Sequence, residues 1–155
     1  MQEEIKSIEI ITPDDWHLHL RESPIIESIF PYSFTNYGKA IIMPNLENPI
    51  IKFSQAMEYY KKIKSLIPPG HKFEPLMTLF LSEKTRAIDI YEGAKSGILK
   101  AIKFYPQGVT TNSYRGIKDL SKMYNLLEKL PDLNIPLLIH GETADSKVDI
   151  YDREA

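Results

Sequence analysis

The sequence contains no cysteine, no long apolar run and no excess of basic charge, and each absence excludes a class of protein. Without cysteine, the chain has no disulfide, thiolate metal ligand or cysteine nucleophile. No apolar run approaches the ~18 residues that a membrane helix needs, and residues 1–4 lack the basic start of a signal peptide. With 19 Lys and Arg against 21 Asp and Glu, nothing favours nucleic acid or an anionic membrane as a partner. We therefore expect a cytoplasmic protein.

What the sequence does contain is an alternation of short apolar segments and amphipathic segments. Its 155 residues are 43% hydrophobic and 26% charged, as in an ordinary globular domain. The apolar segments predict strands at roughly 9–20, 39–43, 74–81, 99–105 and 136–140. The amphipathic segments predict helices at about 24–37, 54–66 (capped by Ser54), 83–96 and 118–130. This alternation predicts an α/β fold with a parallel sheet and helices packed outside it.

The length of each unit indicates which parallel fold this is. Each strand and helix together take about 30 residues, which matches a TIM barrel of about 250 residues divided among eight units. By that arithmetic 155 residues supply about five units, too few to close a barrel. We therefore expect residues 1–155 to form the N-terminal part of a TIM (β/α)8 barrel, with the remaining barrel strands absent from this chain. A five-stranded doubly wound domain is the alternative.

Two histidines lie two residues apart near the end of the first predicted strand. Residues at this spacing share a strand face, so His17, His19 and Arg21 point one way. Leu18 and Leu20 point the other way, toward the helices. Two adjacent imidazoles are half of a site for a divalent transition metal, although they are also simply polar residues at a strand end. Arg21 on the same face favours an anionic ligand that bridges the cations.

Polar residues also end three other predicted strands. Asn45 follows the second strand, where barrel enzymes place functional groups, although it is also an ordinary turn residue after proline. Lys103 near the end of the fourth strand is either a structural lysine or an amine that reacts with carbon dioxide to form a metal-bridging carbamate. His140 ends the fifth strand, whereas His71 follows a Pro-Pro-Gly turn and is expected on the surface. Three of the four histidines and one lysine thus fall at the same end of three strands, which favours a site there.

Together these residues resemble the dihydroorotase family of the amidohydrolase superfamily, specifically its shorter bacterial type. The match runs along essentially the whole chain. It comprises residues 14–21 (DDWHLHLR), 43–45 (MPN), 75–78 (PLMT), 103–106 (KFYP), 110–113 (TTNS), 136–142 (PLLIHGE) and 152–155 (DREA). His-x-His alone marks only the superfamily, whereas the full set in this order is highly specific.

The resemblance implies a metal-dependent hydrolase with a binuclear zinc site in a TIM barrel. In that site His17 and His19 bind one Zn²⁺, a carboxylated Lys103 (N6-carboxylysine) bridges both ions, and His140 binds the second. The family takes another metal-binding histidine and a proton-shuttling aspartate from later strands, beyond Ala155. Within this chain we therefore expect no catalytic base, and we expect the chain alone to be inactive.

The resemblance also implies the substrate and how it is held. Arg21 and Asn45 would bind the substrate carboxylate, and a loop carrying Thr110 and Thr111 would close over it as a lid. The implied reaction is the reversible ring closure of N-carbamoyl-L-aspartate to L-dihydroorotate with loss of water, a step of de novo pyrimidine (UMP) biosynthesis. The implied full-length enzyme is a homodimer.

Two alternatives remain open from the sequence. The first is another cyclic amidase of the hydantoinase or allantoinase kind, although Arg21 and Asn45 favour a ring that carries a carboxylate. The second is a non-catalytic dihydroorotase-like assembly partner, although such a protein has no need of four metal ligands. Glu142, Asp145 and Asp149 lie in the wrong segment to replace the missing aspartate.

Overall fold

The protein is described from a computed structural model that covers residues 7–143 and 145–154. Residues 1–4, where we expect no signal peptide, and Ala155 lie outside these described residues. Inside them, none of the helices combines the length and the apolar character required to cross a bilayer.

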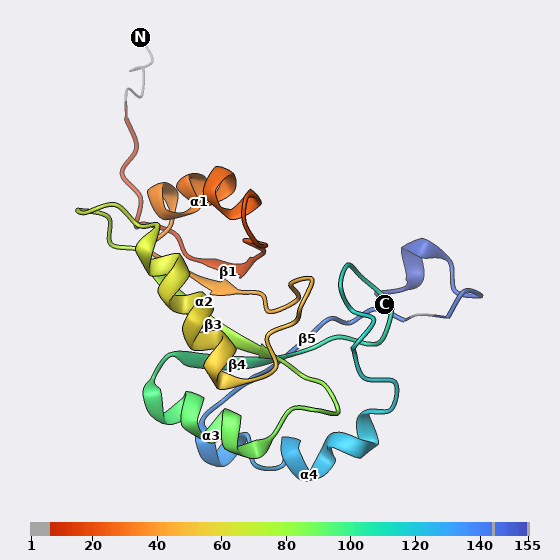
Figure 1. Cartoon of the computed structure of the whole chain (residues 1–155). Coiled ribbons are helices and arrows are strands. Elements are labelled where there is room, and N and C mark those ends of the chain that lie inside the picture. Colours follow the sequence, from red (N-terminus) through yellow and green to blue (C-terminus); the bar gives the residue numbers. More distant parts are fainter. Residues whose placement is uncertain (1–6, 144, 155) are drawn as a thin grey trace.

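Five parallel strands form one sheet in the order β1-β2-β3-β4-β5 (Figure 1). They are β1 (Asp15–Leu18), β2 (Lys39–Ile42), β3 (Glu74–Phe80), β4 (Leu99–Phe104) and β5 (Leu137–Ile139). A doubly wound sheet reverses its strand order at a switch point, whereas this order follows the chain throughout. The doubly wound alternative is therefore wrong, and the sheet is a curled part of a barrel.

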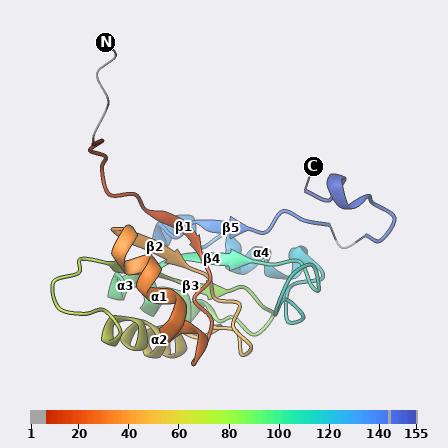
Figure 2. The same cartoon turned by 90° about the horizontal axis from the view of Figure 1, so that it is seen from above.

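The helices connect successive strands and lie outside the sheet (Figures 1 and 2). They are α1 (Ile25–Asn36), α2 (Phe53–Ser65), α3 (Ala87–Ser96) and the short α4 (Tyr124–Leu127). Short 3₁₀ segments flank α4 at Leu120–Met123 and Pro131–Leu133, and a third covers Ile150–Asp152. Crossover helices on parallel strands are the expected way to cover such a sheet.

Each strand sends alternate side chains to two different cores. The side toward the helices joins one continuous core, in which Phe30 of α1, Ile63 of α2 and Ile90 of α3 are almost completely buried. The opposite, concave side holds a smaller cluster of Ile41, Met43 and Leu76, with Leu138 packed against it. The polar side chains at the strand ends described below continue this concave face.

The first strand is shorter than its sequence predicts. We expect a strand at 9–20, but β1 covers only Asp15–Leu18. The apolar residues Ile8, Ile10 and Ile11 alternate in part as a strand would, yet each is more than three-quarters exposed. Within the described chain, no other strand pairs with this segment. Apolar composition alone therefore does not produce a strand where a pairing partner is missing.

The expected helix at 118–130 is also wrong in type. This segment forms a 3₁₀ turn, the four-residue α4 and a second 3₁₀ turn. The side chain of Asp119 caps the first turn by accepting from Ser121 N at 3.0 Å. Later amides bond to carbonyls only three residues back, as Leu130 N does to Leu127 O. Over so few turns, periods of 3.0 and 3.6 residues place apolar side chains almost identically, so the sequence does not separate them.

Candidate metal and carboxylate site

The first strand brings two histidines together on the concave face. His17 lies in β1 and His19 follows it, with ring centroids 5.0 Å apart and ring planes tilted by 38°. Leu20 points to the other side and is completely buried in the helix-covered core. The period-two alternation of a strand thus pairs the imidazoles as the sequence predicts.

Both imidazoles are favoured in their neutral form. Burial lowers the pKa of His19 to about 4, and the positive charge of Arg21 adds to this effect. The pKa of His17 is lowered by burial first and then by the charges of Lys103 and His140. These charges come from β4 and from the end of β5, so the three strand ends converge. A neutral imidazole keeps one ring lone pair, and this is the form that binds metal.

Lys103 is a buried amine near these histidines. It extends from β4 and is only 3% exposed. In the part of the chain that is described, Lys103 forms no ion pair, and its Nζ lies 5.2 Å from the centroid of the Tyr105 ring. Burial lowers the pKa of the amine, because removal from water disfavours the ammonium form. An isolated ammonium at this position is costly, because a buried charge needs a partner or a metal ion to compensate it.

His140 directly follows β5 and contacts an acidic residue that the sequence did not single out as its partner. Its Nε2 lies 3.0 Å from Oε2 of Glu142, and both side chains are about one-fifth exposed. On its other side, the imidazole lies against Tyr105, with ring centroids 5.7 Å apart. In the sequence, the His-x-Glu spacing is the signal for this contact. The contact itself depends on the conformation of the turn after the strand, which the spacing does not determine.

This donor set fits a metal ion in part. His19 Nδ1 is buried and has no hydrogen-bond partner, although the Asn45 side chain approaches the ring closely enough to raise its pKa somewhat. A buried imidazole nitrogen without a partner is the expected state of a ligand atom. Among the described residues, however, no three His, Asp or Glu side chains converge closely enough to hold a metal. The fit therefore depends on Lys103 as an additional ligand.

Arg21 and Asn45 form one hydrogen-bonded unit at the rim of the sheet. Arg21 Nη1 donates to the carbonyl oxygen of Asn45 at 3.0 Å. Arg21 adopts a left-handed backbone (φ 61°), and the hydroxyl of Tyr59 donates to its carbonyl oxygen at 2.6 Å. Asn45 is 1% exposed, and its Oδ1 is buried without a partner. The two residues thus present a charged fork and an unsatisfied amide oxygen beside the histidine pair.

The loop after β4 is docked on Asn45. The amide Nδ2 of Asn45 donates to Thr111 O at 3.0 Å, and Asn112 Nδ2 donates to Asn45 O at 3.1 Å. Further along the loop, the hydroxyl of Tyr114 donates to Glu47 O at 3.2 Å. Thr110 is half-buried and its carbonyl oxygen accepts from Ser113 Oγ. The structure therefore brings the Thr110–Thr111 segment next to the proposed substrate residues.

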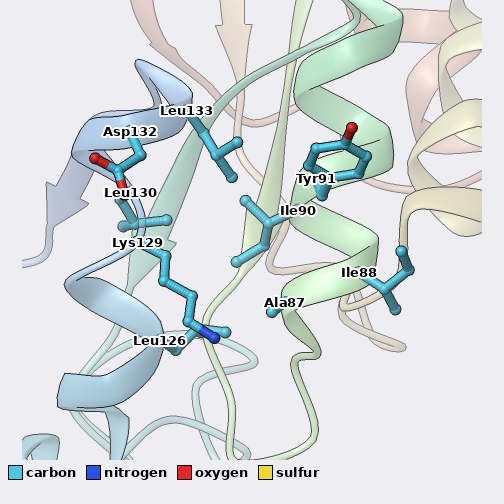
Figure 3. Close-up of a pocket in the computed structure, with 9 residues that line it drawn as sticks. All are labelled: Ala87, Ile88, Ile90, Tyr91, Leu126, Lys129, Leu130, Asp132 and Leu133. Carbon is cyan, nitrogen blue, oxygen red and sulfur yellow. The ribbon is translucent and has the colours of Figure 1, made fainter.

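Two of the hollows formed by the described residues differ in their relation to the site. The first lies at the ends of β4 and β5 and is lined in part by His140, Glu142 and Arg153. The second is an apolar groove between α3 and the segment 126–133 (Figure 3). In Figure 3, Ile90 and Tyr91 of α3 face Leu130 and Leu133 across it. None of its lining residues ends a strand, so this groove is separate from the histidine cluster.

Comparison with known proteins shows which proteins this chain is similar to. A scan against models of protein families finds no match. Among curated proteins, a dihydroorotase of Rhizobium leguminosarum bv. trifolii is 45% identical over 151 residues, 97% of this chain and 44% of that protein. The chain is thus similar to dihydroorotases along almost its whole length. It spans less than half the length of the curated dihydroorotases that it matches.

Solved structures of dihydroorotases agree with this assignment. The enzyme from Campylobacter jejuni matches with a TM-score of 0.82 and 39% identity, over 92% of this chain and 41% of that one. The Saccharomyces cerevisiae enzyme, in complex with 5-fluoroorotic acid, matches with a TM-score of 0.81 and 32% identity over the same shares. An Arthrobacter aurescens L-hydantoinase, at 12% identity and a TM-score of 0.67, shares only the fold. The five strands thus correspond to part of a dihydroorotase TIM barrel, and nothing favours the hydantoinase alternative.

Proposed function

We propose that this chain carries the zinc-binding and carboxylate-binding part of a dihydroorotase active site. The reaction is the reversible cyclisation of N-carbamoyl-L-aspartate to L-dihydroorotate with loss of water. The observation that carries the proposal is the convergence of the neutral His17 and His19, the buried Lys103 and His140 at the ends of β1, β4 and β5. It is supported by 45% identity to a dihydroorotase over almost the whole chain.

Four residues would hold the metal. His17 and His19 would bind one Zn²⁺, Lys103 would bridge two ions as its carbamate, and His140 would bind the second. The carbamate would form when the neutral Nζ attacks carbon dioxide and loses a proton, which turns a neutral amine into an anionic oxygen ligand. When bound, zinc acts as a Lewis acid on a carbonyl oxygen and lowers the pKa of water.

Arg21 and Asn45 would hold the carboxylate that does not react. One guanidinium nitrogen of Arg21 donates to Asn45 O, and the other N–H groups of the planar guanidinium suit bidentate binding of a carboxylate. This contact would orient the ring, so that the amide bond formed or broken lies over the metal-binding residues. The docked loop with Thr110 and Thr111 would then exclude bulk water from the site.

We expect the proton-shuttling base to come from outside these 155 residues. In hydrolysis, the ring C–N bond breaks, hydroxide adds to the carbonyl carbon, and the nitrogen takes a proton. The carboxylate of Glu142, which contacts the His140 ring, is already engaged there. Turnover by the chain alone is therefore expected to be negligible, and metal binding is the appropriate test.

Titration calorimetry of the chain with Zn²⁺ tests the proposal. The double variant His17→Asn, His19→Asn should lose at least tenfold in zinc affinity, because both neutral imidazole ligands are gone. His71→Asn is the matched control, since His71 is exposed and packs edge-to-face on Phe34 away from the strand ends. Equal zinc affinity in the double variant and the control would contradict the proposed metal site.

A further inference from the structure

Glu142 is an acidic residue that contacts the ring of a proposed metal ligand, and the mechanism above gives it no role. Its Oε2 lies 3.0 Å from His140 Nε2, and the two residues are separated by only one position in the chain. The backbone reinforces this arrangement. His140 N donates to Phe104 O at 3.0 Å, and Glu142 N donates to His140 O at 3.0 Å. The imidazole and the carboxylate are therefore both anchored to the end of β5.

This contact determines which ring nitrogen of His140 carries the proton. A carboxylate only accepts hydrogen bonds, so Nε2 must be the donor. In neutral imidazole the lone pair then resides on Nδ1. A metal that bound at Nε2 would have to displace Glu142, whereas one that bound at Nδ1 would leave the hydrogen bond intact.

The surroundings of the ring support the same arrangement. The side of His140 that carries Nε2 is taken up by Glu142, and the imidazole packs against Tyr105, whose hydroxyl reaches Met43 Sδ at 3.6 Å on the concave face. The partner carboxylate lies in the hollow at the ends of β4 and β5. Only one ring nitrogen thus remains for a ligand.

We propose that Glu142 is a positioning residue, which accepts Nε2–H of His140 and so presents Nδ1 as the metal-binding atom. The inference deepens the proposed function, because it rests on His140 being a ligand. A carboxylate behind a metal-binding histidine fixes the ring orientation and raises the basicity of the ligand nitrogen. The carboxylate also contributes negative charge close to a site that collects metal cations.

Nitrogen-15 NMR of histidine-labelled chain tests this role directly. The spectra are recorded without metal at about pH 8, where imidazole is neutral. We expect His140 in the Nε2–H form in the unmutated chain and in Glu142→Gln, because the glutamine oxygen also accepts a hydrogen bond. Glu142→Ala should show a mixture of both tautomers. Glu128→Ala, which removes an exposed carboxylate of the segment after α4, is the control and should leave the tautomer unchanged.

Addition of Zn²⁺ to the same samples gives the second readout. In the unmutated chain, the Nδ1 signal of His140 should shift, and Glu142→Ala should weaken zinc binding by about 10- to 100-fold. Glu142→Gln should recover part of that loss. His140 in the Nδ1–H form, or an unchanged tautomer in Glu142→Ala, would overturn the positioning role while zinc binding survives. Zinc that leaves all His140 signals unchanged would instead overturn the metal site itself, and with it the ligand role of His140.

Discussion

At the scale of single residues, we propose that Arg21 is the residue that makes the site selective for a ring that carries a carboxylate. Its strained left-handed backbone is secured by Tyr59, and one guanidinium nitrogen is secured by Asn45. This leaves a pre-oriented cation beside the histidine pair. A carboxylate on the ring would be recognised here, whereas a ring without one would gain nothing from Arg21.

We predict that Arg21→Met in the active enzyme lowers kcat/KM for dihydroorotate. The loss of transition-state stabilisation should be about 2–4 kcal/mol, because the substrate carboxylate loses a charge-assisted contact. Arg21→Lys keeps the charge without the fork and should also be impaired. Zinc content should not change. The comparison substrate is 5,6-dihydrouracil, which is the same ring without the carboxylate. An equal loss on both substrates would show that Arg21 does not anchor the carboxylate.

Residue-level prediction from the sequence succeeds where strand geometry alone decides the outcome. His17 and His19 share a face because side chains alternate along a strand, and this holds whatever packs nearby. The partner of His140 depends instead on the turn that brings Glu142 back onto the ring. Likewise, the burial of Asn45 results from a loop 66 positions away in the chain, which no local pattern predicts.

At the scale of elements, the start of α2 shows how a distant residue replaces the expected cap. We expect Ser54 to cap a helix at 54–66, but α2 begins at Phe53. Gln55 Oε1 accepts from Lys52 N at 3.0 Å, and Asp89 Oδ1 of α3 accepts from Phe53 N at 3.1 Å. The first amides of the helix are therefore satisfied partly across the interface between two helices.

Asp89→Ala should lower the free energy of unfolding by about 1–3 kcal/mol, because it leaves the half-buried Phe53 amide without its acceptor. Asp89→Asn keeps an oxygen acceptor and should cost less, since the lost ion pair with Arg86 involves a largely exposed guanidinium. Urea denaturation measures both. Glu92→Ala, an exposed change on the same helix, should stay within about 0.5 kcal/mol. If Asp89→Ala matched this control, the capping role would be refuted.

At the scale of the whole molecule, the number and order of strands are predictable from the sequence because unit length and alternation are global properties. Five units of about 30 residues give five parallel strands in chain order, as the structure has them. The lengths of β1 and of the 118–130 helix are not predictable in this way, since they depend on pairing partners and on hydrogen-bond spacing. The resulting sheet gathers β1, β4 and β5 so that residues more than 120 positions apart meet at one end.

The central claim is that His17, His19, Lys103 and His140 form one metal centre. Anomalous diffraction at the zinc edge, from crystals of the protein grown with Zn²⁺ and bicarbonate, tests it most directly. We expect zinc peaks at the ends of β1, β4 and β5, with density for a carboxylate on Nζ of Lys103. A zinc ion bound elsewhere, or a bare Lys103 amine beside fully occupied zinc, would contradict it.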